Sequence, residues 1–246
     1  MRTPFTAQIE ILASPDALAH RVADWLFELA TASTGTFAIA LSGGSTPKRL
    51  YQILAKPPWA EKFPWARTHL FWGDERFVPR DHPLSNFHMV HEALLSHVPI
   101  PAANIHPVPV AQASPQQAAA AYERELQAFY GAQNLDPAKP LFDVALLGLG
   151  EDGHTASLFP GTAALDEREK WVAAVVGAKS EARITLTYPA LESSRHATFL
   201  LEGSGKTAIF QRIRAGDDSF PAARLHPSGE LRWFLDRAAA GETPVP

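Results

Sequence analysis

Residues 37–47 read FAIALSGGSTP, and this segment is the clearest indication of the fold class. The apolar run Phe37–Leu41 predicts a buried strand, because it is short, contains aromatic and branched residues, and ends at serine and glycine. The two glycines at 43–44 allow a tight turn, after which Ser45 or Thr46 is placed to cap a helix. A strand, a glycine turn and a helix in direct succession indicate an α/β fold.

The same alternation recurs along the chain. Other short apolar runs predict further strands, which are His69–Trp72, Phe142–Leu147, Trp171–Val176, Ile184–Leu186, Thr198–Leu201 and Leu231–Leu235. Three stretches that open on a serine and continue at helical spacing predict helices, at 14–29, 85–96 and 114–131. This order predicts an α/β fold with a doubly wound, mostly parallel sheet and helices on both faces.

On this prediction, the first strand begins at residue 37, and a single helix precedes it in the sequence. The proline-rich stretches 56–64 and 98–109 are expected to be loops rather than domain boundaries. With no repeat and no low-complexity linker, residues 1–246 are expected to form one domain.

The composition excludes several classes of protein. The chain has 246 residues and no cysteine, which excludes disulfides, thiolate metal sites and a cysteine nucleophile. Its 22 basic and 26 acidic residues give a net charge of −4, which disfavours nucleic acid as a partner. No apolar run approaches the roughly 18 residues of a membrane span, and the start of the chain lacks the layout of a signal peptide. We therefore expect a soluble, cytoplasmic protein without a membrane partner.

Ligands of doubly wound sheets bind outside the carboxyl ends of the strands, so the residues after each strand are the candidates for function. The first group is Ser42, Gly43, Gly44, Ser45 and Thr46. The free backbone N–H groups of such a turn and the helix dipole favour a phosphate or a carboxylate. The alternatives are a plain turn and a serine-hydrolase elbow, which requires a glycine where the chain has alanine, two residues before the serine.

The second group, Gly73-Asp74-Glu75-Arg76, follows the strand predicted at His69–Trp72. Arg76 is suited to a phosphate, and Asp74 to binding sugar hydroxyls or moving a proton. The alternative is a solvated, charged turn.

The third group, residues 147–155, reads LGLGEDGHT. Its glycines match the dinucleotide pattern G-x-G-x-x-G, but two acidic residues inside the turn oppose a pyrophosphate, and Pro160 leaves little room for the long helix that should follow. The glycines instead let the loop present Asp152 and His154 together. Histidine titrates near neutral pH and a neighbouring carboxylate orients it, so His154 is a candidate general base.

The fourth group, residues 203–207, reads GSGKT. A Walker A loop would need a glycine at position 200, where the chain has leucine. Lys206 near a helix start is a candidate second cation for a phosphate, and the alternative is an exposed lysine. His91-Glu92 begins like the zinc motif H-E-x-x-H, but Leu95 stands at the second histidine position, so neither a metal nor another cofactor is expected.

Several short motifs, taken in order, resemble those of one known family. They are SGGSTP at 42–47, GDER-x-VP at 73–79, Ser85-Asn86, G-x-G-x-DGH-x-ASLFP at 148–160, RITLT at 183–187 and G-x-GK at 203–206. The sequence resembles the 6-phosphogluconolactonases, carboxylic ester hydrolases with a Rossmann-like fold that is shared with the glucosamine-6-phosphate deaminases.

The resemblance implies hydrolysis of 6-phospho-D-glucono-1,5-lactone to 6-phosphogluconate, the second step of the oxidative pentose phosphate pathway, without a cofactor. It implies that the turn at 42–46, Arg76 and Lys206 hold the 6-phosphate. His154 would take a proton from the attacking water and return it to the ring oxygen. Asp152 would orient His154 or bind a sugar hydroxyl, with Asp74 near the reacting end. The partner would be a small sugar-phosphate lactone, and the protein a monomer or a small homo-oligomer.

Two other functions are compatible with this scaffold. Amino-sugar-phosphate deaminases also carry Asp-Gly-His, but they have a carboxylate five residues after the histidine, where this chain has Phe159. Sugar-phosphate sensor domains of transcriptional regulators usually carry an added DNA-binding module. Here the first predicted strand already begins at residue 37 and the chain is acidic.

Overall fold

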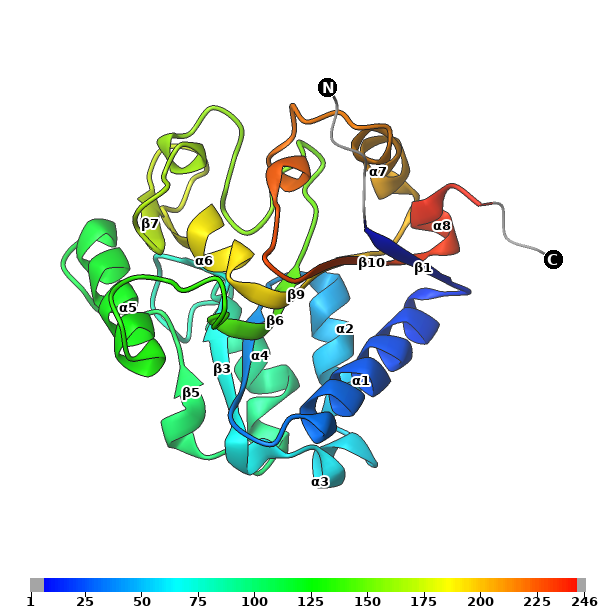
Figure 1. Cartoon of the computed structure of the whole chain (residues 1–246), viewed down its shortest axis with the longest axis horizontal. Coiled ribbons are helices and arrows are strands. Elements are labelled where there is room, and N and C mark those ends of the chain that lie inside the picture. The colour runs from blue at the N-terminus through cyan, green and yellow to red at the C-terminus, as the bar shows by residue number, and fades with distance from the viewer. Residues whose placement is uncertain (1–6, 243–246) are drawn as a thin grey trace.

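Seven parallel strands form the main sheet, in the order β1-β10-β9-β6-β2-β3-β5 (Figure 1). The protein is described from a computed structural model, which describes residues 7–242. The strands are β1 (Gln8–Leu12), β2 (Phe37–Leu41), β3 (Thr68–Trp72), β5 (Ile105–His106), β6 (Phe142–Leu147), β9 (Ser194–Leu201) and β10 (Glu230–Asp236). The predicted α/β fold with a mostly parallel sheet is confirmed.

Helices cover both faces of this sheet. In Figure 1, α1, α2 and α4 lie below the strands and α6 and α7 lie above them. The helices are α1 (Pro15–Ala32), α2 (Ser45–Leu54), α3 (Trp59–Lys62), α4 (Asn86–Ala93), α5 (Pro115–Tyr130), α6 (Tyr188–Glu192), α7 (Thr207–Arg214) and α8 (Arg237–Ala240). No helix within residues 7–242 is long and apolar enough to cross a membrane.

The predicted helix caps are found at the start of α1 and of α5. The hydroxyl of Ser14 accepts a hydrogen bond from Ala17 N at 3.2 Å, and that of Ser114 accepts one from Gln117 N at the same distance. Gly131 ends α5 in the left-handed conformation, with φ 82°.

A second, three-stranded sheet stands apart from the main one. It is antiparallel, in the order β4 (Asp74–Arg76), β8 (Arg183–Leu186), β7 (Val172–Val175). The strands predicted at 171–176 and 184–186 are therefore present, but in a sheet of their own. Residues 74–76, which were not predicted as a strand and for which a charged turn was the alternative, form its third strand.

Four local predictions were wrong. The first strand is β1, at an edge of the main sheet beside β10, so residue 37 starts the second strand. The loop predicted at 56–64 contains α3, and the one at 98–109 contains β5, because Ile105 pairs with Leu70. Helix α2 begins at Ser45 with Gly44 as its N-cap, so neither hydroxyl residue caps it.

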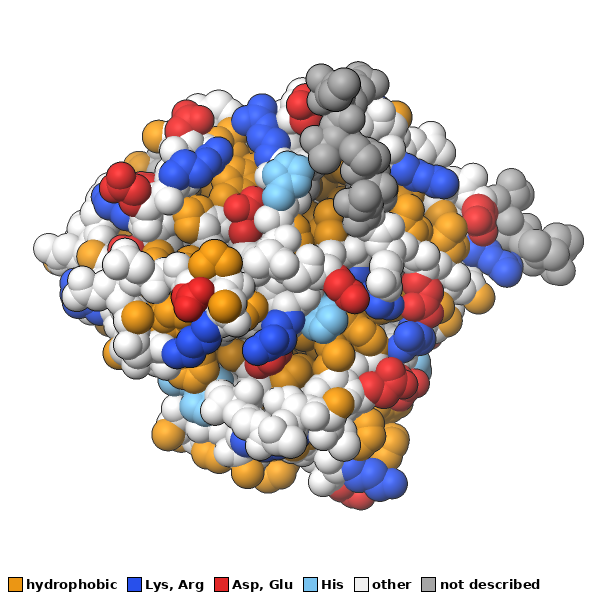
Figure 2. Space-filling model, viewed as in Figure 1, with side chains coloured by type: hydrophobic (Ala, Val, Ile, Leu, Met, Phe, Trp, Pro, Cys, Tyr) orange, Lys and Arg blue, Asp and Glu red, His pale blue; other side chains and the backbone are white. Residues whose placement is uncertain are grey.

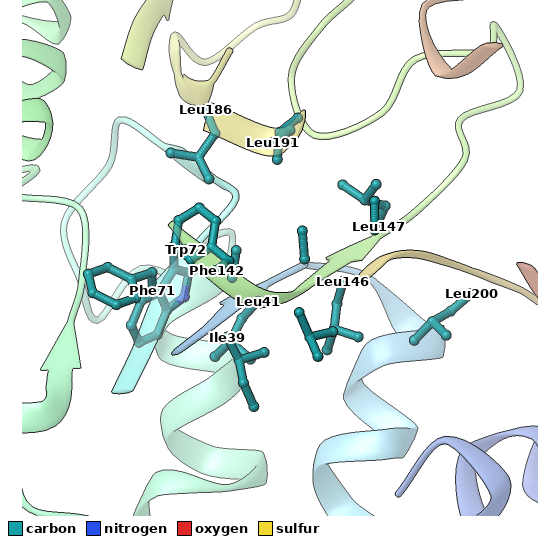
Figure 3. Close-up of a cluster of buried hydrophobic side chains, with 14 of the residues drawn as sticks. Ile39, Leu41, Phe71, Trp72, Phe142, Leu146, Leu147, Leu186, Leu191 and Leu200 are labelled. Carbon is teal, nitrogen blue, oxygen red and sulfur yellow. The ribbon is translucent and has the colours of Figure 1, made fainter. Parts of the chain in front are cut away.

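The core lies between the sheet and its covering helices (Figure 3). Ile39, Leu146 and Phe71 are almost wholly buried in the main sheet, and Leu186 and Leu191 pack from the β8–α6 segment above it. Full burial of such a side chain stabilises the fold by about 1.5–3 kcal/mol. The core thus fixes the carboxyl ends of β2, β3 and β6 at one edge, where Gly73 N donates to Leu41 O at 2.8 Å.

This edge is also the switch point of the sheet. From β2 the chain adds β3 and β5 on one side, while β6, β9, β10 and β1 lie on the other. A crevice forms between the loops that leave strands on either side of such a point, and ligands bind there. Elsewhere the visible surface mixes acidic and basic side chains (Figure 2).

Candidate active site

A cavity of about 280 Å³ lies at this switch point. Its lining combines residues from all four sequence groups with several that were not predicted, and comprises Ser42, Gly43, Gly44, Asp74, Arg76, Asn86, Gly148, Leu149, Gly150, His154, Ala156 and Lys206. Of the ten predicted site residues, three lie outside this lining: Ser45, Thr46 and Asp152.

The β2–α2 turn lies close to the start of α4. Tyr51, buried in α2, donates its hydroxyl to Ser42 O at 2.8 Å and accepts from Ser42 N at 3.0 Å. A Cβ on Gly43 would lie 2.1 Å from Oδ1 of Asn86, so only glycine fits there. Gly44 has a φ of 104°, which also favours glycine, and it places the start of α2 at the cavity.

Ser45 is exposed and its hydroxyl donates to Glu202 Oε1 at 3.2 Å. Glu202 also lies 3.6 Å from the Arg49 guanidinium. This contact ties the β2–α2 turn to the loop that carries Lys206. A ligand of the cavity thus meets Ser42, Gly43 and Gly44 from this turn.

The strand β4 sends its side chains alternately to opposite faces, which separates the roles of its three residues. Asp74 and Arg76 line the cavity, whereas Glu75 is buried. The Glu75 carboxylate accepts from Asn86 N and Phe87 N, both at 2.7 Å, and so holds the start of α4. Burial raises the pKa of Glu75, and these backbone N–H groups only partly offset the rise.

Asp74 is oriented by the loop that carries Ser157 and by the start of α4. Its Oδ2 accepts from the Ser157 hydroxyl at 2.6 Å, and its backbone oxygen accepts from Asn86 Nδ2 at 2.9 Å. Ser157 N in turn donates to Thr185 Oγ1 at 3.1 Å. Ala156, just before Ser157, has a φ of 48°, a conformation that costs a non-glycine residue about 1–2 kcal/mol. The loop is therefore held firmly against β4 and β8.

Three cations lie in or next to the cavity lining. Arg76 lines the cavity and donates to Leu84 O. Arg183 stands directly opposite Arg76 across the β4–β8 pair, so both side chains lie on the same face. Burial and the charge of Arg76 lower the pKa of Arg183, and its buried Nη1 has no hydrogen-bond partner among the described residues. Lys206 reaches the cavity from the turn before α7.

His154 and Asp152 form a hydrogen-bonded pair through Nδ1 and Oδ1. His154 N also donates to Asp152 Oδ1, at 3.2 Å. With Nδ1 engaged, Nε2 is the ring nitrogen left for a ligand. Partial burial raises the pKa of the Asp152 carboxyl, but the hydrogen bonds from His154, with the charges of His154 and Lys179, outweigh it and lower that pKa below its ordinary value.

The His154–Asp152 pair occupies the space that a side chain at position 150 would need. A Cβ at this position would lie 2.0 Å from His154 Nδ1 and 2.8 Å from Asp152 Oδ1. Gly150→Ala is therefore expected to displace the imidazole and to lower kcat for the enzyme's reaction about 10- to 10²-fold, since misplacements near 1 Å cost that much. Gly35→Ala, where a Cβ meets nothing within 4 Å, is the matched control. Equal kcat values for the two variants would contradict the expected displacement.

The sequence analysis did not assign Asn86, Ser157 or Arg183 to the site. Asn86 and Ser157 lie within quoted motifs, but their side chains act on Asp74 through contacts across 12 and 83 residues of chain, which no spacing reveals. Arg183 enters through the β4–β8 pairing, and β4 was not predicted as a strand. Within residues 7–242, no group of three or more potential ligands is arranged to hold a metal ion.

Comparison with known proteins identifies the family. A model of "Glucosamine-6-phosphate isomerases/6-phosphogluconolactonase" matches residues 13–233. The chain belongs to this family. It is 43% identical to a 6-phosphogluconolactonase of Nostoc sp. over 96% of this chain and 98% of that one, and 45% identical to one of Synechocystis sp. over 85% and 86%. The resemblance seen in the motifs is confirmed.

Solved structures of 6-phosphogluconolactonases also match this chain. A 6-phosphogluconolactonase from Trypanosoma brucei matches with a TM-score of 0.83 and 31% identity, over 96% of this chain and 98% of that one. One from Thermotoga maritima matches with a TM-score of 0.80 and 31% identity, over 94% and 100%. A monomeric glucosamine-6-phosphate deaminase shares the fold, with a TM-score of 0.80 at 18% identity, over 95% and 99%.

Proposed function

We propose that the chain hydrolyses 6-phospho-D-glucono-1,5-lactone to 6-phospho-D-gluconate. One observation carries this proposal: the cavity of about 280 Å³ is lined both by His154, whose ring is hydrogen-bonded to the Asp152 carboxylate, and by the cations Arg76 and Lys206. A sugar phosphate has a dianion at one end and, in the lactone, an electrophilic carbonyl at the other. The names of the relatives from Nostoc and Synechocystis support the same activity.

The phosphate end of the substrate would lie against Gly43, Gly44, Arg76 and Lys206. Backbone N–H groups at the start of α2 and charge-assisted hydrogen bonds from the two cations suit a phosphate. Arg183 adds a third positive charge next to Arg76. Its Nη1 has no hydrogen-bond partner among the described residues and could donate to the phosphate. Ser42 also lines the cavity. Ser45 and Thr46 would contribute through the N-terminal turn of α2, with the Ser45 hydroxyl first leaving Glu202.

In the chemical step His154 Nε2 takes a proton from water as its oxygen attacks the lactone carbonyl carbon. The tetrahedral intermediate collapses by breaking the bond between that carbon and the ring oxygen. His154 returns the proton to the departing ring oxygen, which becomes a hydroxyl, and the carboxylic acid then ionises. Asp152 fixes the ring so that Nε2 faces the cavity, and Asp74, held by Ser157, lies at the reacting end. General base catalysis of this kind is worth about 10²–10⁴-fold.

An amino-sugar deaminase reaction lacks one group here. Position 159, five residues after His154, holds a buried phenylalanine whose ring packs 4.6 Å from the imidazole. An apolar ring at this point shields the base and cannot carry a proton during ring opening. The pair therefore suits hydrolysis of an already activated ester.

A substrate panel tests the proposal. The lactone is generated in situ from glucose 6-phosphate by glucose-6-phosphate dehydrogenase, and its disappearance is compared with spontaneous hydrolysis. Release of ammonia from glucosamine 6-phosphate is measured in parallel. We expect acceleration of lactone hydrolysis and no ammonia. Binding of 6-phosphogluconate without acceleration would identify a sensor and contradict the proposal.

A further inference from the structure

Lys179, which is not among the residues that line the cavity of about 280 Å³, lies next to Asp152 of the His154–Asp152 pair. It lies in the connection between β7 and β8, two residues after Gly177, whose φ of 83° turns the chain. Its Nζ lies 3.9 Å from Asp152 Oδ2, whereas the other oxygen, Oδ1, is bound to His154. The two oxygens of one carboxylate thus have different cationic or proton-donating partners.

An aromatic ring completes the arrangement. Lys179 Nζ lies 5.0 Å from the centre of the Phe159 ring, within the range of a cation–π contact, and that ring packs against His154. Lys179, Asp152, His154 and Phe159 therefore form a closed ring of contacts. Lys179, Asp152 and Phe159 also line a second cavity, of about 750 Å³, whose lining does not include His154. The Asp152 side chain is 42% exposed, and its hydrogen bonds from His154 both go to Oδ1, so Lys179 is the partner that the structure gives to Oδ2.

We propose that Lys179 is a positioning residue for the lactonase reaction: it holds Asp152 Oδ2 and lowers the pH at which the His154–Asp152 pair takes up a proton. The proposal rests on the proposed function for its kinetic consequence. A nearby positive charge disfavours protonation of a carboxylate, and the charge of Lys179 is among the causes that lower the pKa of Asp152. Because the two groups are coupled, the acid limb of the activity profile belongs to the pair rather than to either residue.

Other charges face His154 as well. They come from its own loop (Asp152 and the exposed Glu151), from β4 (Asp74 and Arg76, with Arg183 and Glu181 behind Arg76) and from the turn before α7 (Lys206). All of these remain when Lys179 is replaced. A difference between the wild-type enzyme and a Lys179 variant therefore reports on Lys179 alone.

The test compares Lys179→Met, Lys179→Arg and the control Lys170→Met, which removes the same charge at the other end of β7. For Lys179→Met we expect the acid limb of kcat/KM to move up by about half a pH unit, since both side chains are partly exposed and water screens their interaction. The pKa of Asp152, followed by ¹³C NMR of its carboxyl carbon, is expected to rise toward its ordinary value. Lys179→Arg and Lys170→Met are expected to keep the wild-type limb.

The salt dependence of the shift distinguishes an effect of the Lys179 charge from an effect of its packing. The shift in Lys179→Met is expected to shrink at about 1 M NaCl, where the screening length is about 3 Å. An unchanged acid limb in Lys179→Met, or equal shifts in the Met and Arg variants, would overturn the proposal. If instead the wild-type protein does not hydrolyse the lactone, the proposed function fails, and the Asp152 titration still decides whether Lys179 acts on the pair.

Discussion

His154→Ala is expected to lower kcat for hydrolysis of 6-phosphogluconolactone about 10²- to 10⁴-fold while KM changes little. Among the described residues that line the cavity, His154 is the histidine, and a carboxylate holds its Nδ1. The residues proposed to bind the phosphate are unchanged in this variant. The measurement is the rate of lactone disappearance above the spontaneous rate, with substrate generated in situ and varied across KM.

His88→Ala is the matched control, because His88 is a partly exposed histidine on α4 that pairs with Glu92 at 3.5 Å and lies outside the cavity lining. It is expected to retain wild-type kcat. The kcat of Asp152→Asn is expected to lie between those of His154→Ala and His88→Ala, since the imidazole stays in place but loses its charged partner. A His154→Ala enzyme with more than about a tenth of wild-type kcat would show that His154 is not the base.

Replacing both cations of the cavity, Arg76→Ala with Lys206→Ala, is expected to lower kcat/KM for the phosphorylated lactone about 10²- to 10⁴-fold. Each charge-assisted hydrogen bond to a phosphate is worth about 1.5–3 kcal/mol. Unphosphorylated glucono-1,5-lactone cannot use these contacts, so its kcat/KM is expected to stay near the wild-type value. The ratio of the two substrates is therefore the measurement.

The control removes one lysine and one arginine from the exposed surface, Lys62→Ala with Arg214→Ala, on α3 and α7. It changes the net charge equally and is expected to leave both substrates unaffected. If the cavity variant lost activity equally on both lactones, Arg76 and Lys206 would support the fold or the chemical step rather than bind the phosphate.

Sequence patterns predicted the parts of this molecule that depend on local order. The apolar run Phe37–Leu41 and its glycines place a turn at the switch point, and the glycine-rich loop places His154 beside Asp152. Strand ends of a parallel sheet meet at one edge, which is why four groups far apart in the sequence line one cavity. The organisation of residues 1–246 as one domain stays a prediction, as do the roles of the site residues.

What could not be predicted depends on pairing between distant segments. Residues 8–11 of β1 alternate polar and apolar, but this pattern is too short to predict a strand alone, and the place of β1 is set by β10, more than 200 residues away. The short β4 becomes a strand only because β8 pairs with it, and this pairing brings Arg183 beside Arg76. Serine is a residue type that often caps helices, but Gly44 is the N-cap of α2, and the Ser45 hydroxyl donates a hydrogen bond to Glu202 instead.

The most direct measurement is a crystal structure of the His154→Ala variant with 6-phosphogluconate bound. The predicted result has the phosphate within hydrogen-bond distance of Arg76, Lys206 and the Gly43–Gly44 backbone, and the carboxylate carbon beside the space vacated by the imidazole. A ligand bound in the reverse orientation, or in the cavity of about 750 Å³ beside Lys179, would contradict the assignment of the active site.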